Sequence, residues 1–168
     1  MPTGEFLLID NSNSFTKLAL ASREGLLGEP RRIATPEVSA ASLGKALRGW
    51  RFETAVLSSV VPKKRTVIEE GLAGCRIIGV SAKLRLGAGI DYPKPETIGA
   101  DRLANAAFAA ATFRPPVIVV DFGTAVSFDI ISRERKYVGG VIAPGLAAMT
   151  DYLHQRTALL PKITLLEP

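Results

Sequence analysis

Two short segments of the chain have the residue types of a turn that binds phosphate and metal. Each is an apolar run that ends in an aspartate, Asp10 in the first segment and Asp121 in the second. The residues that follow are mostly small or carry a hydroxyl or amide, namely Asn11-Ser12-Asn13-Ser14 and Phe122-Gly123-Thr124-Ala125. Small residues let the backbone approach a phosphate, and an aspartate supplies a hard oxygen ligand for Mg²⁺. Turns favour the same residue types for structural reasons, but two copies in matched contexts favour a shared binding role.

Three charged residues elsewhere could take part in such a site. Lys17 lies on the strand expected after the first turn and could neutralise a phosphate, although a surface lysine on a hairpin is the plainer interpretation. Asp101 falls in the first turn of an expected helix, which is also the commonest structural place for an aspartate. If Asp101 faces a cleft, it could accept a hydroxyl proton during phosphoryl transfer. Arg102 could bind a substrate carboxylate, or it could form a salt bridge with Glu96 or Asp91.

One further pattern is a weaker signal for phosphate binding, and the motifs of several other enzyme classes are absent from the sequence. Gly139, Gly140 and Gly145 lie where a strand is expected to lead into a helix, and a phosphate can approach a helix N-terminus there. Glycine-rich turns of this kind also occur for packing reasons alone. The single histidine, His154, is expected at the surface. The sequence contains no nucleophile–histidine pair, no metal-ligand cluster and no Walker-type lysine loop, which argues against a P-loop kinase.

Composition indicates a soluble globular protein. The chain has 168 residues, of which 47% are hydrophobic and 22% charged, enough for one ordinary domain or two small ones. It has no apolar run of membrane-spanning length, no visible targeting signal and a single cysteine, so we expect a cytoplasmic protein with no membrane partner. The net charge of +5 comes from short clusters without interleaved aromatic residues, so we expect no nucleic-acid partner.

Alternating strand and helix patterns predict an α/β fold. The segment 81–98 is expected to be a surface loop, and Arg114-Pro115-Pro116 to mark the boundary between a first lobe, residues 1–114, and a second lobe, residues 115–168. We expect strands at 5–10, 15–22, 30–34, 53–58, 76–80, 117–121, 125–131 and 137–142, and helices at 39–47, 63–72, 99–112 and 145–156.

In their order along the chain, these motifs resemble the type III pantothenate kinase family. Gly-Ala-Asp-Arg between two such phosphate loops is the specific part of the signature, and the resemblance covers nearly the whole chain. Its elements are Ile9-Asp10-Asn11-Ser12-Asn13-Ser14 with Lys17, Ser58-Ser59-Val60-Val61-Pro62, Tyr92, Gly99-Ala100-Asp101-Arg102, Asp121-Phe122-Gly123-Thr124-Ala125, Gly139-Gly140 with Pro144-Gly145, and Thr157-Ala158-Leu159-Leu160-Pro161.

The resemblance implies an actin-like (ribonuclease H-like) two-lobe fold with mixed sheets, acting as a homodimer. It also implies transfer of the γ-phosphoryl group of ATP to the primary hydroxyl of pantothenate, the first step of coenzyme A synthesis. Asp101 would then accept the hydroxyl proton, and Asp121 would hold a monovalent cation, K⁺ or NH₄⁺. Asp10 would contact Mg²⁺, directly or through water. The implied pantothenate contacts are Tyr92, Gly99, Ala100, Asp101 and Arg102, and the implied ATP contacts are Asp10, Asn11, Ser12, Asn13, Ser14, Lys17 and Thr124.

Two features depart from the family pattern. The first loop normally has glycine where this chain has Ser12, and serine resists a positive φ and crowds a close phosphate. The family also has a further C-terminal part, so we expect the second lobe to be incomplete in this chain. Three alternatives therefore stay open: a non-catalytic ligand-binding or regulatory relative, one piece of a split kinase, and another actin-like small-molecule kinase.

Overall fold

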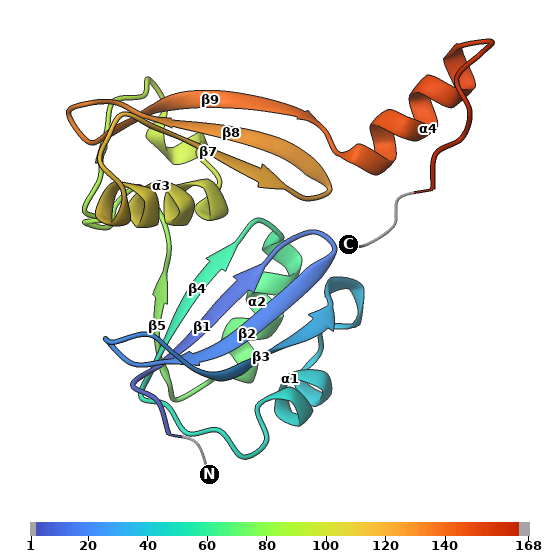
Figure 1. Ribbon diagram of the computed structural model, residues 1–168. Coiled ribbons are helices and arrows are strands. Elements are labelled where there is room, and N and C mark those ends of the chain that lie inside the picture. Colours follow the sequence, from blue (N-terminus) through green and yellow to red (C-terminus); the bar gives the residue numbers. More distant parts are fainter. Residues whose placement is uncertain (1–2, 165–168) are drawn as a thin grey trace. The chain divides into compact units, whose positions relative to one another are not determined.

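The chain forms two compact units in the computed structural model, which describes residues 3–164. The first unit comprises the described residues up to Leu86 together with Glu96–Ala104, and the second comprises Gly87–Pro95 and the described residues from Asn105 onward (Figure 1). The division by compactness falls inside helix α3 (Ala100–Thr112). A compact unit need not coincide with a lobe of the fold, so the boundary between 1–114 and 115–168 stays a prediction.

The first unit is built on a five-stranded mixed sheet. Its strands lie in the order β3-β2-β1-β4-β5, and β2 alone runs antiparallel to the others. This order brings the carboxyl ends of β1, β4 and β5 to one edge of the sheet, which is where open α/β sheets bind ligands. The strands are β1 (Phe6–Asn11), β2 (Phe15–Ala21), β3 (Leu26–Ala34), β4 (Thr54–Ser59) and β5 (Arg76–Gly79).

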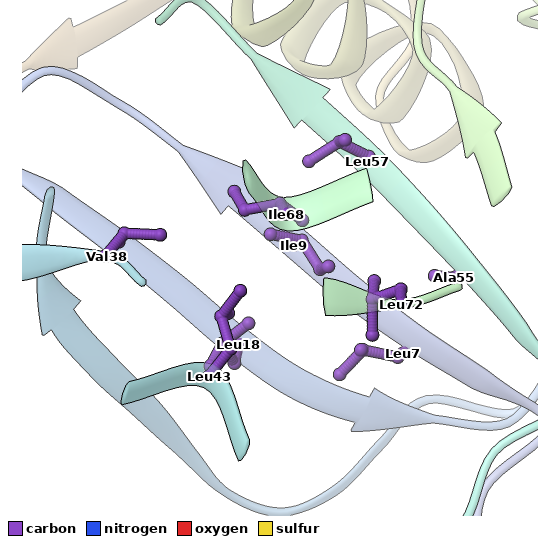
Figure 2. Packing of buried hydrophobic residues seen from close by; sticks show 9 residues of the cluster. All are labelled: Leu7, Ile9, Leu18, Val38, Leu43, Ala55, Leu57, Ile68 and Leu72. Atoms are coloured by element: carbon purple, nitrogen blue, oxygen red, sulfur yellow. The ribbon is translucent and has the colours of Figure 1, made fainter. Parts of the chain in front are cut away.

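The core of this unit lies between one face of the sheet and two helices. Alternate residues of the central strands point to that face, and α1 (Ala40–Ala46) and α2 (Pro62–Gly71) cover it. Burying each large aliphatic side chain contributes about 1.5–3 kcal/mol. Figure 2 shows the resulting cluster of Leu7, Ile9, Leu18, Val38, Leu43, Ala55, Leu57, Ile68 and Leu72.

Local sequence signals explain where these helices begin. Ser39 caps α1, because its side chain accepts a hydrogen bond from the Ser42 N–H while the Ser42 hydroxyl accepts one from the Ser39 N–H. Pro62 is the first residue of α2, where a missing N–H costs nothing. A short 3₁₀ turn, η1 (Thr35–Glu37), follows β3 and precedes Ser39.

The second unit contains a four-stranded sheet in the order β6-β9-β8-β7. The strands β7 (Val117–Phe122), β8 (Ala125–Ile131) and β9 (Lys136–Pro144) form an antiparallel meander, and β6 (Gly89–Ile90) pairs in parallel with β9. Helix α4 (Leu146–Arg156) follows β9 directly.

The predicted α/β class with mixed sheets is confirmed, and every expected strand and helix is present. Two expectations about extent were wrong. The segment 81–98 is not wholly a loop, because it contains β6 and the 3₁₀ turn η2 (Pro95–Thr97). Strand β3 begins at Leu26 rather than near residue 30, because pairing with β2 continues past Gly28. Within residues 3–164, no helix combines the length and apolar character needed to cross a membrane.

Candidate functional site

The two aspartate-ended segments form equivalent hairpins in the two units. Asp10 is the next-to-last residue of β1, and residues 12–14 turn the chain into the antiparallel β2. Asp121 is the next-to-last residue of β7, and residues 123–124 turn the chain into the antiparallel β8. The similarity of these two segments in sequence is therefore matched by a similarity in local structure.

Both carboxylate oxygens of Asp10 have partners within its own hairpin. The Ser12 hydroxyl donates to Oδ1 at 2.9 Å, and the Lys17 ammonium lies 3.5 Å from Oδ2. Lys17 stands opposite Asp10 in the β1–β2 register, and its side chain is 64% exposed, so it remains accessible to an anion. The backbone strain expected at Ser12 does not arise, since Arg135 is the one non-glycine residue in the described chain with a positive φ.

Asn11 takes part in a buried polar network beneath the turn. Its side chain is fully buried, donates to Thr16 Oγ1 at 2.8 Å and accepts from the Ser59 hydroxyl at 2.7 Å. Asn13 and Ser14, in contrast, are exposed at the tip of the turn. The Thr16 hydroxyl lies 3.0 Å from the Thr35 hydroxyl, and neither threonine was singled out from the sequence. The available signal was that Asn11 and Thr16 occupy the inward, otherwise apolar positions of β1 and β2.

Asp101 lies at the start of α3, beside a glycine that makes room for it. Its Oδ1 accepts a hydrogen bond from the Arg102 N–H at 2.8 Å, and a Cβ atom on Gly99 would lie 2.5 Å from the same oxygen. The carboxylate therefore sits at the positive end of a helix dipole. Ala100 is buried, and Arg102 is half-buried. Of the two salt-bridge partners considered for Arg102, Asp91 pairs with Lys136 at 3.8 Å.

A cavity of about 420 Å³ adjoins this helix start within the first unit. It lies beyond the carboxyl ends of β4 and β5, and a cavity of this size fits a small-molecule ligand. Arg65, Lys83 and Glu96 give it charged walls. The full lining is Ser59, Val60, Arg65, Val80, Ser81, Ala82, Lys83, Glu96, Ile98, Gly99 and Ala100.

The second hairpin carries Asp121 and Thr124 and is supported by the start of α4. Asn105 donates from Nδ2 to Asp121 Oδ2 at 3.3 Å. The Gly145 N–H donates to the Thr124 carbonyl at 3.2 Å. A Cβ atom on Gly145 would collide with the carbonyl oxygens of Gly123 and Thr124, so only glycine lets the helix start approach the turn so closely.

Tyr92 is held by two residues of the second unit. Its ring packs edge-on against Tyr137 with 6.2 Å between ring centroids, and it lies against the backbone of Gly139, which has φ +121°. The structure thus groups the residues Asp10 to Lys17 with Gly99 to Arg102 in the first unit. It groups Tyr92, Asp121 and Thr124 in the second unit.

Asp10 and Asp121 are better suited to binding a metal ion that a substrate also binds than to holding a metal ion with protein side chains alone. Among the described residues, no group of three or more His, Cys, Asp or Glu side chains could hold a metal ion. Mg²⁺ in phosphoryl-transfer sites is usually bound by one or two carboxylates plus substrate phosphates, a donor set that Asp10 can join. Asp121 is exposed and offers oxygen donors of the kind alkali cations accept.

The strand order of the first sheet indicates the fold class of the protein. Strand order 3-2-1-4-5 with the second strand alone antiparallel is the ribonuclease H-like arrangement, and a repeated Asp-turn hairpin is characteristic of its actin-like branch. A solved structure, the ethanolamine utilization protein EutJ from Carboxydothermus hydrogenoformans, aligns over 89% of this chain and 55% of its own length at TM-score 0.49 and 14% identity. That likeness is too distant to support a functional comparison.

The chain belongs to the type III pantothenate kinase family, whose family model matches residues 6–168. The type III pantothenate kinase of Akkermansia muciniphila is 52% identical over 97% of this chain and 67% of its own length. The corresponding protein of Methylacidiphilum infernorum is 41% identical over 96% of this chain and 59% of its own length. That of Geobacter sulfurreducens is 39% identical over 70% of this chain and 48% of its own length. The matched region thus spans between about half and two thirds of these relatives.

Proposed function

We propose that this chain acts as a pantothenate kinase, transferring the γ-phosphoryl group of ATP to the primary hydroxyl of pantothenate in coenzyme A synthesis. The observation that carries the proposal is the placement of Asp101. Its carboxylate lies at the N-terminus of α3, next to a glycine that leaves room for it, and the residues just before it line a cavity of small-molecule size. Family membership supports the same reaction.

The proposed reaction moves one proton and one phosphoryl group. The pantothenate hydroxyl oxygen forms a bond to the γ-phosphorus of ATP, the bond from that phosphorus to the β–γ bridging oxygen breaks, and ADP leaves. Asp101 takes up the hydroxyl proton and later releases it to water. Positioning and charge stabilisation dominate such transfers, so an ordinary carboxylate is sufficient as the acceptor.

The other site residues would bind and orient the two substrates. Tyr92, Gly99, Ala100 and Arg102 contact pantothenate, with the Arg102 guanidinium facing its carboxylate. The first hairpin, from Asp10 to Lys17, and Thr124 of the second contact ATP. Asp10 holds Mg²⁺ and Asp121 a monovalent cation, K⁺ or NH₄⁺, and these ions offset phosphate charge. In this proposal the protein works in the cytoplasm as a homodimer, with ATP and pantothenate as its small-molecule partners.

A steady-state assay tests the proposal directly. The chain is incubated with ATP, Mg²⁺, K⁺ and pantothenate, and ADP and phosphorylated pantothenate are quantified together. Asp101→Asn keeps the side-chain shape but cannot take up the proton, so we expect kcat to fall by about 10²- to 10⁴-fold. The affinity for ATP should stay within about twofold, because Asp101 is not proposed to touch the nucleotide. Equal turnover by the variant, or no turnover by the unaltered chain, would contradict the proposal.

A non-catalytic, ligand-binding relative of the family is the second candidate. The observation that favours it is the hydrogen bond from Ser12 to Asp10 Oδ1, which occupies an oxygen that would otherwise be open to Mg²⁺. Titration calorimetry separates the two candidates. Pantothenate binding without MgATP binding or turnover supports the ligand-binding relative, and measurable turnover excludes it. A panel of hydroxyl acceptors tests whether pantothenate is the preferred substrate of an actin-like kinase.

A further inference from the structure

We propose that Thr35 is a positioning residue that fixes the backbone of the first turn in the orientation needed to bind phosphate. The phosphate-binding part of this inference rests on the proposed function. Thr35 follows β3 directly and is buried, with a relative exposure of 3%. Neither its type nor its place in the sequence marks it as part of a nucleotide site.

A chain of hydrogen bonds that all run in one direction passes through Thr35 and ends at the Ser12 carbonyl. The Ser59 hydroxyl donates to Asn11 Oδ1, and Asn11 Nδ2 donates to Thr16 Oγ1. The hydroxyls of Thr16 and Thr35 lie 3.0 Å apart, and Thr35 Oγ1 donates to the Ser12 carbonyl at 2.7 Å. Because the one hydroxyl proton of Thr35 goes to Ser12, Thr16 must be the donor in the bond between them. Every link in the chain is therefore fixed in direction.

Thr35 holds two carbonyl groups of the turn at once. Its hydroxyl binds the Ser12 carbonyl, and its backbone N–H donates to the Ser14 carbonyl at 2.9 Å. In a trans peptide the N–H points opposite to the C=O, so the Asn13 N–H faces away from Thr35 and out of the turn. The two carbonyls, which would repel a phosphate, are thereby turned inward. Asn13 is exposed at the tip of the turn, so we infer that its N–H is left to face an anion, as in a backbone nest.

Because the network is buried, breaking any of its hydrogen bonds is energetically costly. Asn11 and Thr16 are both 0% exposed, so a link that is removed leaves a polar group without water or a partner. The donor end of the chain, Ser59, also lines the 420 Å³ cavity beside Gly99. The network therefore ties the first turn to the wall of the proposed pantothenate site.

The test compares Thr35→Val with Thr35→Ser in the whole chain. Valine matches the shape of threonine but lacks the hydroxyl, whereas serine keeps it. Thr66→Val is the matched control, because Thr66 is exposed on α2 and its hydroxyl bonds only within that helix. Amide hydrogen exchange of Ser12 and of residue 35 reports the turn, since these N–H groups donate to Phe15 and Ser14 across it. Calorimetry with MgATP and with pantothenate reports binding.

We expect Thr35→Val to lose amide protection in the turn but not in β4 and β5, and to raise the MgATP Kd by about tenfold. Its pantothenate Kd should stay within about twofold of the unaltered chain, as should both affinities of Thr35→Ser and Thr66→Val. Unchanged turn protection and MgATP affinity in Thr35→Val would overturn the inference. If the unaltered chain binds no MgATP, the proposed function fails, while amide exchange still decides whether Thr35 holds the turn.

Discussion

At the scale of single residues, two of the three proposed catalytic or binding carboxylates, those of Asp10 and Asp101, depend on a small neighbour. Asp10 is held by the hydroxyl of Ser12, and Asp101 occupies space that a side chain on Gly99 would take. The position of each of these two carboxylates therefore depends on an uncharged neighbour. This dependence can be measured, because replacing such a neighbour should disturb one carboxylate and leave the fold in place.

Gly99→Ala tests the space beside Asp101. Its new Cβ atom would lie 2.5 Å from Asp101 Oδ1 and 3.6 Å from Val60 Cγ1, so the carboxylate must move. We expect kcat to fall by about tenfold or more, with MgATP affinity retained, because a displaced acceptor loses its alignment with the hydroxyl. Steady-state kinetics at saturating ATP measure the effect.

Gly44→Ala is the matched control for this substitution. Gly44 lies in α1 and has an ordinary helical φ, and a Cβ atom added there would have no neighbouring atom within 4 Å. An alanine there should leave kcat unchanged and stabilise the fold by about 0.5–1 kcal/mol, since glycine is unfavourable inside a helix. A Gly99→Ala variant with unaltered kcat would show that Asp101 is not held where catalysis needs it.

At the scale of elements, alternation and turn chemistry were sufficient to predict most of the fold. Leu7 and Ile9 alternate with half-exposed residues in β1, and α1 and α2 begin within one residue of the helix starts expected at 39 and 63. Strand β6 could not be predicted, because two residues in a segment rich in glycine and proline carry no periodicity and pair only through a distant strand.

The candidate site, like the fold, could be predicted only in part. Its exposed polar turns stand out in the sequence, and the structure shows that the two hairpins are built alike. The supporting network does not stand out, because Thr16 and Thr35 are 19 residues apart and meet only when β2 pairs with β3. A threonine in a strand also fits ordinary strand propensity, so its hydroxyl gives no separate signal.

Gly145→Ala tests the support of the second hairpin by the start of α4. A side chain there would collide with the carbonyl oxygens of Gly123 and Thr124, so the turn and the helix must separate. We expect a loss of about 1–3 kcal/mol in the free energy of unfolding, measured by urea denaturation. Gly123→Ala lies in the same turn, but its Cβ atom would be 3.6 Å from the nearest oxygen, an ordinary contact. Its stability should change by less than about 0.5 kcal/mol, and equal losses in both variants would refute the steric account.

At the scale of the whole molecule, the chain consists of two units that each present one Asp-turn hairpin. The region it shares with two of its relatives is 67% of the Akkermansia muciniphila protein and 59% of the Methylacidiphilum infernorum protein. Its formal net charge of +5 favours the approach of anions such as ATP and pantothenate, and that attraction weakens as salt rises. The central claim of the proposed function at this scale is that both hairpins bind the same nucleotide.

Amide hydrogen exchange of the whole chain, with and without MgATP, tests this claim most directly. If one ATP contacts both turns, saturating MgATP should slow exchange in residues 12–14 and 123–124 together, with a single Kd and one nucleotide bound per chain. The strands β3 and β5, which form the two edges of the first sheet, should exchange as before. Protection confined to one turn, or two turns that saturate at different ATP concentrations, would contradict the account.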